Sequence, residues 1–141
     1  CLETVAGQRA ILRWARTIYL NQPESLLHRT VADAAQIDMA AVVAAYRAGD
    51  PALAQMVAQL GRYLGIAAAN LAAALNVPLV VLAGSVARFG AALAQAVRAE
   101  MVQRSFAPLA ELTEVRASAL GDDAVMLGAA ALLLANELGA V

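Results

Sequence analysis

The stretch Leu79-Val80-Val81-Leu82-Ala83-Gly84-Ser85 decides the fold that this sequence predicts. Its first four residues form an unbroken apolar run rich in β-branched side chains, which is typical of a strand buried on both faces of a parallel sheet. Ala83-Gly84-Ser85 then predicts a turn, because glycine adopts backbone angles that other residues avoid. We expect a helix to follow within residues 77–102, so that its free N–H groups lie beside the turn.

Such a glycine turn has two interpretations. Most turns of this kind only connect a strand to a helix, whereas some approach the phosphates of a nucleotide closely. The residues of the turn alone leave both interpretations open.

A second strand-turn-helix unit occupies residues 113–138. Polar and apolar residues alternate from Thr113 to Ala119, which is the pattern of an edge strand with one polar face. Gly121-Asp122-Asp123 follows, and we expect the two carboxylates to cap a helix over residues 124–138. The small residues Gly128-Ala129-Ala130-Ala131 would let another element pack close to that helix.

The first part of the chain is predicted to be helical. Apolar residues recur at helical spacing from Val5 to Tyr19, which predicts a single helix that ends before Asn21-Gln22-Pro23. An irregular segment follows over residues 21–29. A second helix is expected after Asp38, with Gly49 as its stop signal.

A third and longer helix is predicted to begin directly after this stop. Asp50 is a favourable capping residue, and Pro51 stands at the first helical position, where proline is preferred. Apolar residues then recur at steps of three and four, so the helix should continue to about Asn76.

Composition bounds the possible functions of the 141 residues. Hydrophobic residues make up 62% of the chain and charged residues 15%, so much of the surface is expected to contact something other than water. The net charge of −1 and the isoelectric point near 5.8 provide no basic face for nucleic acid. The lack of a basic face therefore predicts no direct DNA binding by this chain. The apolar surplus predicts oligomerisation with other copies of it.

The chain contains one cysteine, which excludes an internal disulfide and suits a reducing cytoplasm. Residues 63–87 carry no charge, but Asn76 and Pro78 interrupt them, which favours a buried helix and strand over a membrane span. The length of the chain predicts a single domain, residues 1–141. Since its first residue is Cys1 rather than methionine, we expect this domain to be truncated at its N-terminus.

Few side chains are candidates for chemistry. His28 has no partner at ligand spacing and is expected to be structural or solvated. Cys1 by itself cannot form a zinc site, because zinc usually takes four ligands. Glu3 is most simply a carboxylate that suits the start of a helix. No nucleophile–base pair is evident, so no catalytic residue is assigned.

Several blocks of sequence carry a resemblance to a known family. They are Cys1-Leu2-Glu3-Thr4-Val5-Ala6, Gly61-Arg62-Tyr63-Leu64-Gly65-Ile66-Ala67, Asn70-Leu71, Leu75-Asn76, Val80-Val81-Leu82-Ala83-Gly84, Gly121-Asp122-Asp123-Ala124 and Leu127-Gly128-Ala129-Ala130. In this order they resemble the C-terminal part of the ROK family, which comprises sugar kinases, sugar-responsive transcriptional repressors and related proteins. The resemblance implies the C-terminal half of a ribonuclease H-like, actin- and hexokinase-like domain. That half would be a helix-dominated α/β structure whose two parallel strands, about 78–83 and 113–119, are covered by helices.

The resemblance also implies roles for two residues near the start of the chain. Cys1 and Glu3 match the last Cys and Glu of the family's zinc signature, CxCGxxGCxE. Cys1 would then be one ligand of a zinc site whose other ligands lie upstream, and Glu3 would accept a hydrogen bond from a sugar hydroxyl. The family's catalytic aspartate and phosphate-binding hairpin would also lie upstream, so this fragment alone would be inactive as a kinase.

The turn separates the two branches of the family. Family kinases have a run of glycines against the nucleotide, where this chain has Ala83-Gly84-Ser85, a degenerate nucleotide-binding turn. The ending Gly121–Ala130 also resembles the repressor branch. We therefore expect the sugar-sensing and oligomerising part of a repressor, with a sugar or sugar phosphate as ligand and with DNA bound only through an upstream domain.

Two alternatives stay open. The chain could be the C-terminal lobe of an ATP-dependent sugar kinase, and only then would ATP and Mg²⁺ be required. It could also be an assembly module without a ligand.

Overall fold

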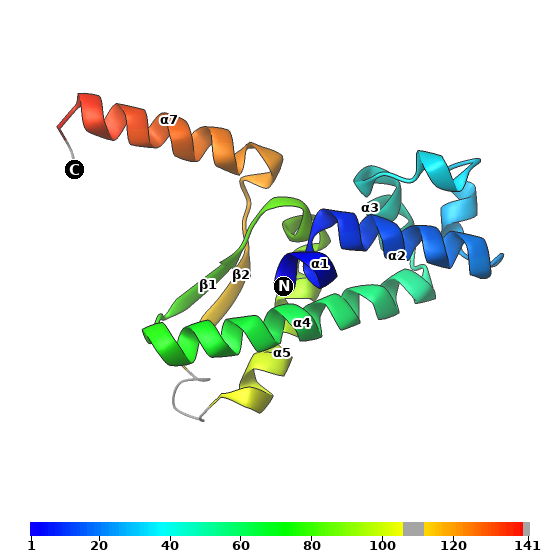
Figure 1. The fold of residues 1–141 in the computed structure, drawn as a ribbon, viewed down its shortest axis with the longest axis horizontal. Coiled ribbons are helices and arrows are strands. Elements are labelled where there is room, and N and C mark those ends of the chain that lie inside the picture. Colours follow the sequence, from blue (N-terminus) through cyan, green and yellow to red (C-terminus); the bar gives the residue numbers. More distant parts are fainter. Residues whose placement is uncertain (106–111, 140–141) are drawn as a thin grey trace.

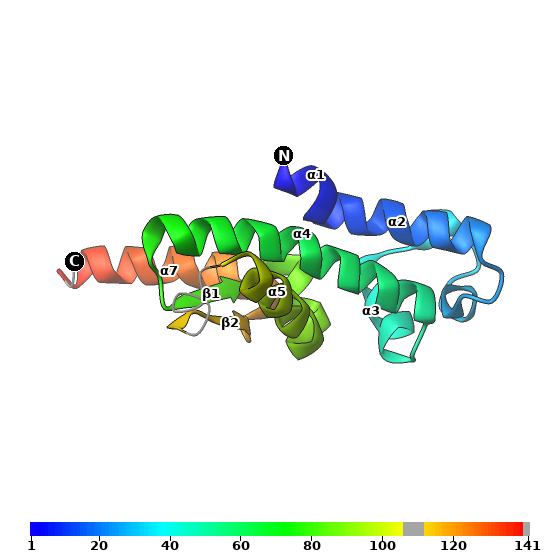
Figure 2. The ribbon, with the colours of Figure 1, turned by 90° about the horizontal axis from the view of Figure 1, so that it is seen from below.

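The computed structural model describes residues 1–105 and 112–139. Its elements in chain order are α1 (Leu2–Ala6), α2 (Gln8–Asn21), the 3₁₀ turns η1 (Leu26–Arg29) and η2 (Ala34–Gln36), α3 (Met39–Arg47), α4 (Pro51–Leu75), β1 (Leu79–Leu82), the 3₁₀ segment η3 (Gly84–Phe89), α5 (Gly90–Arg104), β2 (Glu114–Ala117), η4 (Gly121–Asp123) and α7 (Ala124–Glu137). Figure 2 shows α4 running along the body, with α1 and α2 on one side and α5 with the strands on the other.

The predicted starts of α3 and α4 are confirmed, and each depends on an aspartate. Asp38 accepts a hydrogen bond from the backbone N–H of Ala41 at 2.8 Å. Asp50 accepts from the N–H groups of Ala52 and Leu53 at 2.9 and 3.0 Å, directly ahead of the first turn of α4. These carboxylates satisfy N–H groups that have no partner within their own helix.

The single helix predicted over the first twenty residues is instead two helices. The backbone of Gly7 is extended, with φ −83° and ψ 169°, and it separates α1 from α2. A β-carbon at Gly7 would overlap the Glu3 carboxylate and lie 2.6 Å from the Glu3 carbonyl oxygen. The apolar periodicity missed this break because the buried stripe resumes in α2 after it.

Close packing of α4 against α5 forms the centre of the body. Two glycines one turn apart on α4 make this contact possible: a β-carbon at Gly61 would overlap Ala96, and one at Gly65 would lie 2.6 Å from the β-carbon of Glu100. Glu100 is buried and forms an ion pair of 2.6 Å with Arg104. The two helices therefore approach more closely than side chains of ordinary size would permit.

The two strands are parallel neighbours, as predicted. Leu79 pairs with Glu114 at one end of the ladder, and Leu82 pairs with Ala117 at the other. The buried Thr113 fixes the start of β2, since its hydroxyl donates to the Val77 carbonyl at 3.0 Å. Helix α5 also contacts Thr113, through the side chain of Arg98.

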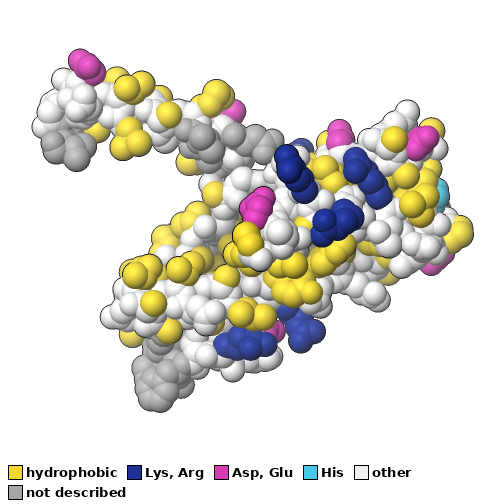
Figure 3. Space-filling model, viewed as in Figure 1, with side chains coloured by type: hydrophobic (Ala, Val, Ile, Leu, Met, Phe, Trp, Pro, Cys, Tyr) yellow, Lys and Arg dark blue, Asp and Glu magenta, His cyan; other side chains and the backbone are white. Residues whose placement is uncertain are grey.

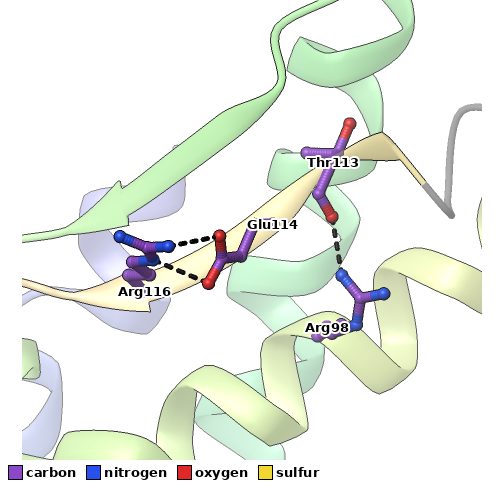
Figure 4. Close-up of polar contacts among 4 residues, drawn as sticks. All are labelled: Arg98, Thr113, Glu114 and Arg116. Carbon is purple, nitrogen blue, oxygen red and sulfur yellow. Dashed lines mark hydrogen bonds and ion pairs between the residues drawn. The ribbon is translucent and has the colours of Figure 1, made fainter.

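Polar side chains form hydrogen bonds at the start of β2 and along its exposed face. Figure 4 shows Arg98 of α5 donating to the Thr113 carbonyl at 2.7 Å. On the exposed face of the strand, Arg116 forms two hydrogen bonds of 2.6 and 2.7 Å with Glu114. The pairing holds the pKa of Glu114 below its usual value and that of Arg116 above it, mainly through these hydrogen bonds. The alternation predicted for an edge strand is present.

One expectation for β1 is not met within this chain. The unbroken apolar run predicts burial on both faces, but Leu79 is 42% exposed and Val81 is 52% exposed. In the described part of the chain β1 pairs only with β2. One face of the strand therefore presents apolar side chains that nothing in residues 1–105 or 112–139 covers.

Helix α7 extends away from the body (Figure 1). Asp123 precedes it but makes no capping hydrogen bond, so the prediction of a cap by this aspartate is wrong; the side chain of Asp122 lies outside the described residues. A β-carbon at Gly128 would meet nothing within 4 Å, so the close contact expected at Gly128-Ala129-Ala130-Ala131 is not formed by the described residues. Among these residues no helix has the length and apolar character to cross a membrane.

Candidate functional site

A pocket of about 390 Å³ lies where the start of the chain meets the turn after β1. Its volume is within the range of small-molecule sites, roughly 300–1,000 Å³. Its lining comes from α1, the Gly7 break, the start of α2, the turn and α4: Leu2, Glu3, Ala6, Gly7, Gln8, Leu64, Ala83, Ser85 and Val86. The fold thus joins Glu3 and the turn residues Ala83 and Ser85, which the sequence suggested as two separate sites.

The position of the Glu3 carboxylate depends on the break between α1 and α2. Glu3 lies in the first turn of α1, and its side chain is exposed. Because Gly7 has no β-carbon, the carboxylate occupies the space beside the break. The result is a carboxylate at the pocket wall that is free to accept hydrogen bonds from a ligand.

A hydrogen bond crosses the pocket wall from the turn to α2. The Ser85 hydroxyl donates to the side-chain oxygen of Gln8 at 2.7 Å. Sequence reasoning missed Gln8, because the contact spans 77 positions and no local pattern marks it. Gly7 was missed for a similar reason, although a glycine inside an apparent helix was a usable signal.

The turn itself is formed as predicted, but the expected helix does not follow it directly. Gly84 has φ +71°, a left-handed conformation that favours glycine. The six residues Gly84–Phe89 form the 3₁₀ segment η3, and α5 begins only at Gly90. The aligned N–H groups expected beside Ser85 therefore lie further along the chain. Gly84 itself is not part of the pocket lining.

The remaining candidates do not join the pocket. Cys1 is exposed, and no group of three or more His, Cys, Asp and Glu residues is placed to bind a metal among the described residues. A lone thiol does not make a zinc site, so this part of the chain could contribute only one ligand. His28 packs its ring 3.9 Å from that of Tyr19, with Nε2 3.0 Å from the Tyr19 carbonyl oxygen, a structural contact.

Glu3 is the only titratable side chain in the lining of the pocket. A groove of equal volume between α2 and α4 is lined by Trp14, Gln55 and Gln59 among others, and it contains no titratable group. The pocket at Glu3 is therefore the stronger candidate for a specific ligand. Its polar lining, Glu3, Gln8 and Ser85, offers hydrogen-bonding groups to a ligand.

Comparison with known proteins places the chain in a family. The ROK family model matches residues 1–136. A glucokinase of Halalkalibacterium halodurans is 31% identical over 137 residues, which cover 97% of this chain and 42% of the relative. A glucokinase of Thermotoga maritima is 29% identical over 133 residues, 94% of this chain and 42% of the relative.

Solved structures agree on the fold. A ROK family glucokinase from Streptomyces griseus, in complex with glucose and AMPPNP, superimposes with a TM-score of 0.81 at 26% identity, over 94% of this chain and 44% of that chain. A ROK family transcriptional regulator described as a homologue of the E. coli MLC protein gives 0.69 at 26% identity, over 83% and 28%. The predicted helix-dominated α/β fold is confirmed.

The chain spans less than half the length of these relatives. The family match nevertheless extends from residue 1 to residue 136, within the last turn of α7. This chain therefore belongs to the ROK family.

Proposed function

We propose that this chain is the sugar-binding portion of a ROK-type transcriptional regulator. The observation that carries the proposal is the meeting of Glu3, Gln8 and Ser85 at one pocket. A carboxylate accepts hydrogen bonds from sugar hydroxyls, while an amide and a hydroxyl both donate and accept. Such a set suits a polyol ligand better than it suits an apolar one.

The turn favours a regulator over a kinase. Ala83 and Ser85 carry side chains where a nucleotide-binding turn would use glycine to bring the backbone close to the phosphates. The Ser85 hydroxyl instead contacts Gln8, so the turn serves the wall of the pocket. In a regulator, the sugar would act by binding one domain arrangement more tightly than another. DNA would be bound by a separate part of the intact protein.

A second candidate function is supported by the comparisons. The relatives that match nearly the whole chain are named glucokinases, and one solved relative binds glucose with a nucleotide analogue. In that case this chain would be one lobe of a sugar kinase that uses ATP with Mg²⁺. A coupled assay of ATP consumption, run on the intact protein with a panel of hexoses, separates the two. Robust sugar-dependent turnover would contradict the regulator proposal.

The direct test of the pocket is sugar binding by the intact protein. Glu3→Gln should weaken binding about tenfold, since a charge-assisted hydrogen bond is worth roughly 1.5–3 kcal/mol. Isothermal titration calorimetry against glucose and other hexoses measures this change. Glu24→Gln removes an exposed carboxylate outside the pocket lining and serves as the matched control. Equal affinity in wild type and Glu3→Gln would remove Glu3 from the site.

Zinc, self-association and a cytoplasmic location belong to this proposal as well. Cys1 would supply one zinc ligand in the intact protein, alongside ligands from elsewhere. Metal analysis of the intact protein and of its Cys1→Ser variant measures that role, and equal zinc content in the two would contradict it. The exposed apolar side chains of β1 and α7 support an assembly of several copies.

A further inference from the structure

Three arginines lie on one face of α2. Arg9, Arg13 and Arg16 are four and three positions apart, so they follow one another along the helix surface, and all three are exposed. Figure 3 shows basic side chains gathered over this part of the molecule, with an acidic side chain beside them. The whole chain carries ten arginines and no lysine.

Two of these arginines line a small pocket that shares Glu3 with the pocket proposed to bind sugar. It has a volume of about 190 Å³ and is lined by Glu3, Thr4, Arg9, Ala10 and Arg13. Glu3 lines both pockets, so a ligand held by its carboxylate would lie within reach of the two guanidinium groups. Arg16 follows one turn later and is not part of the lining.

The Arg13 guanidinium is held in place, and both guanidinium groups keep donors for a ligand within the described part of the chain. Arg13 donates through one terminal nitrogen to the Thr4 carbonyl at 3.0 Å, which fixes its side chain across the junction of α1 and α2. Within the described residues, Arg9 makes no hydrogen bond or ion pair. Neither arginine forms an ion pair with Glu3 there, although all three line one pocket. No residue within 1–105 or 112–139 accepts from the remaining N–H donors of Arg9 and Arg13.

We propose that Arg9 and Arg13 form an anion subsite that takes the phosphate or carboxylate group of a charged sugar. The proposal rests on the sugar-binding function proposed above, since Glu3 would hold the hydroxyls of the same ligand. The Glu3 carboxylate alone would repel an anionic ligand. The adjacent guanidinium groups of Arg9 and Arg13 offset the negative charge of that carboxylate. The planar donor fork of arginine matches both phosphate and carboxylate oxygens. The subsite thus favours charged sugars over neutral ones.

The experiment measures discrimination between neutral and charged sugars by the intact protein. Calorimetric titrations at constant ionic strength would use glucose, mannose and galactose, each as the neutral sugar, the 6-phosphate and the uronate. At least one charged derivative should bind about tenfold more tightly than its neutral parent. The form that gains affinity identifies the anionic group.

Substitutions assign the discrimination to the subsite. Arg9→Gln should lower the affinity for the charged derivative about tenfold, and it should lower the affinity for the neutral sugar much less. Arg9→Lys, which keeps the charge but loses the fork, should restore part of the affinity. Arg29→Gln makes the same change of charge outside the pocket, on η1, and should have no effect at physiological salt.

Three results would overturn the subsite. If the neutral sugars bind but their charged derivatives bind no better, the sugar site stands and the subsite fails. Equal losses in Arg9→Gln and Arg29→Gln would show only a general field of positive charge. If neither neutral nor charged sugars bind, the sugar-binding function fails together with the subsite.

Discussion

Gly7 determines where the Glu3 carboxylate lies, and it does so through the absence of a side chain. Its backbone angles, φ −83° and ψ 169°, are open to any residue, so Gly7→Ala is compatible with the local conformation. The added methyl group would overlap the Glu3 carboxylate. We expect Gly7→Ala to weaken sugar binding roughly tenfold, in the range of a lost charge-assisted hydrogen bond.

Calorimetry of the single and double variants checks this expectation. If Gly7 acts through Glu3, then adding Gly7→Ala to Glu3→Gln should cause little further loss. A loss in the double variant equal to the sum of the single losses would show that Gly7 supports the pocket independently of Glu3.

Asp50 is the most completely enclosed charged residue in the described part of the chain. Burial raises the pKa of its carboxyl group, but hydrogen bonds from Ser25 and from the N–H groups of Leu53, Leu26 and Ala52 together outweigh that effect and lower the pKa. The Ser25 hydroxyl donates at 2.6 Å and the Leu26 N–H at 2.7 Å. The ionised carboxylate therefore ties the start of η1 to the start of α4.

The lowered pKa has a consequence for stability against pH. A carboxyl group whose folded pKa is depressed stabilises the protein above the unfolded value and loses that contribution as pH falls through the folded value. For Asp50 the loss begins near the ordinary value of 3.8 and is complete only below the lower, folded pKa. Urea unfolding between pH 6 and pH 2 measures it.

Asp50→Asn should lower the free energy of unfolding at pH 6 by about 1–3 kcal/mol, because an amide nitrogen would face the Leu26 N–H and leave a buried donor unpaired. Asp38→Asn is the matched control, since Asp38 caps α3 at an exposed position and asparagine is an equally good cap. Similar losses in both variants would contradict the special role of Asp50.

At the scale of the element, α4 and α5 depend on two small residues. Gly65→Ala would place a methyl group 2.6 Å from the β-carbon of Glu100 and 2.8 Å from the Val97 carbonyl oxygen. Overpacking of this kind costs about 1–3 kcal/mol, more than the 0.5–1 kcal/mol or so that alanine gains over glycine inside a helix. We expect Gly65→Ala to destabilise the protein.

Gly128→Ala is the corresponding control in α7, where an added β-carbon meets nothing within 4 Å. Thermal unfolding followed by circular dichroism should show a lower melting temperature for Gly65→Ala and an unchanged or slightly higher one for Gly128→Ala. A stabilised Gly65→Ala protein would show that α5 can move away from α4 without cost.

At the scale of the whole molecule, α7 and one face of β1 leave apolar side chains uncovered. Leu132 is 71% exposed and Leu133 is 69% exposed, and Figure 3 shows hydrophobic side chains along the extended helix. A helix that is apolar on most sides is normally buried against other elements. In isolation, residues 1–141 should therefore bind a hydrophobic dye and self-associate.

Replacing Leu132 and Leu133 together by glutamine should reduce both dye fluorescence and self-association. Light scattering and dye titration measure the two effects. Leu20→Gln is the control, because Leu20 is equally exposed at 71% but belongs to α2 rather than to α7 or β1. If the double variant bound dye as strongly as wild type, the exposed surface would have to be sought elsewhere.

Local patterns were enough for much of this molecule. The caps at Asp38 and Asp50, the end of α4 at Asn76 and the positions of the two strands follow from local residue patterns, so the sequence by itself determined them. The family blocks likewise required only residue types in order. Asp123 was the exception, since it precedes α7 but makes no capping hydrogen bond.

The candidate site was decided by the tertiary structure. Glu3, Gln8 and Ser85 meet only because α4 packs on α1 and β1 returns the chain to the start of α2. Contacts between residues 77 positions apart leave no periodic trace in the sequence. The Glu3 carboxylate in turn occupies space that only a residue without a β-carbon at position 7 leaves open. Local preferences therefore determined the elements, whereas side-chain packing between distant segments determined the pocket.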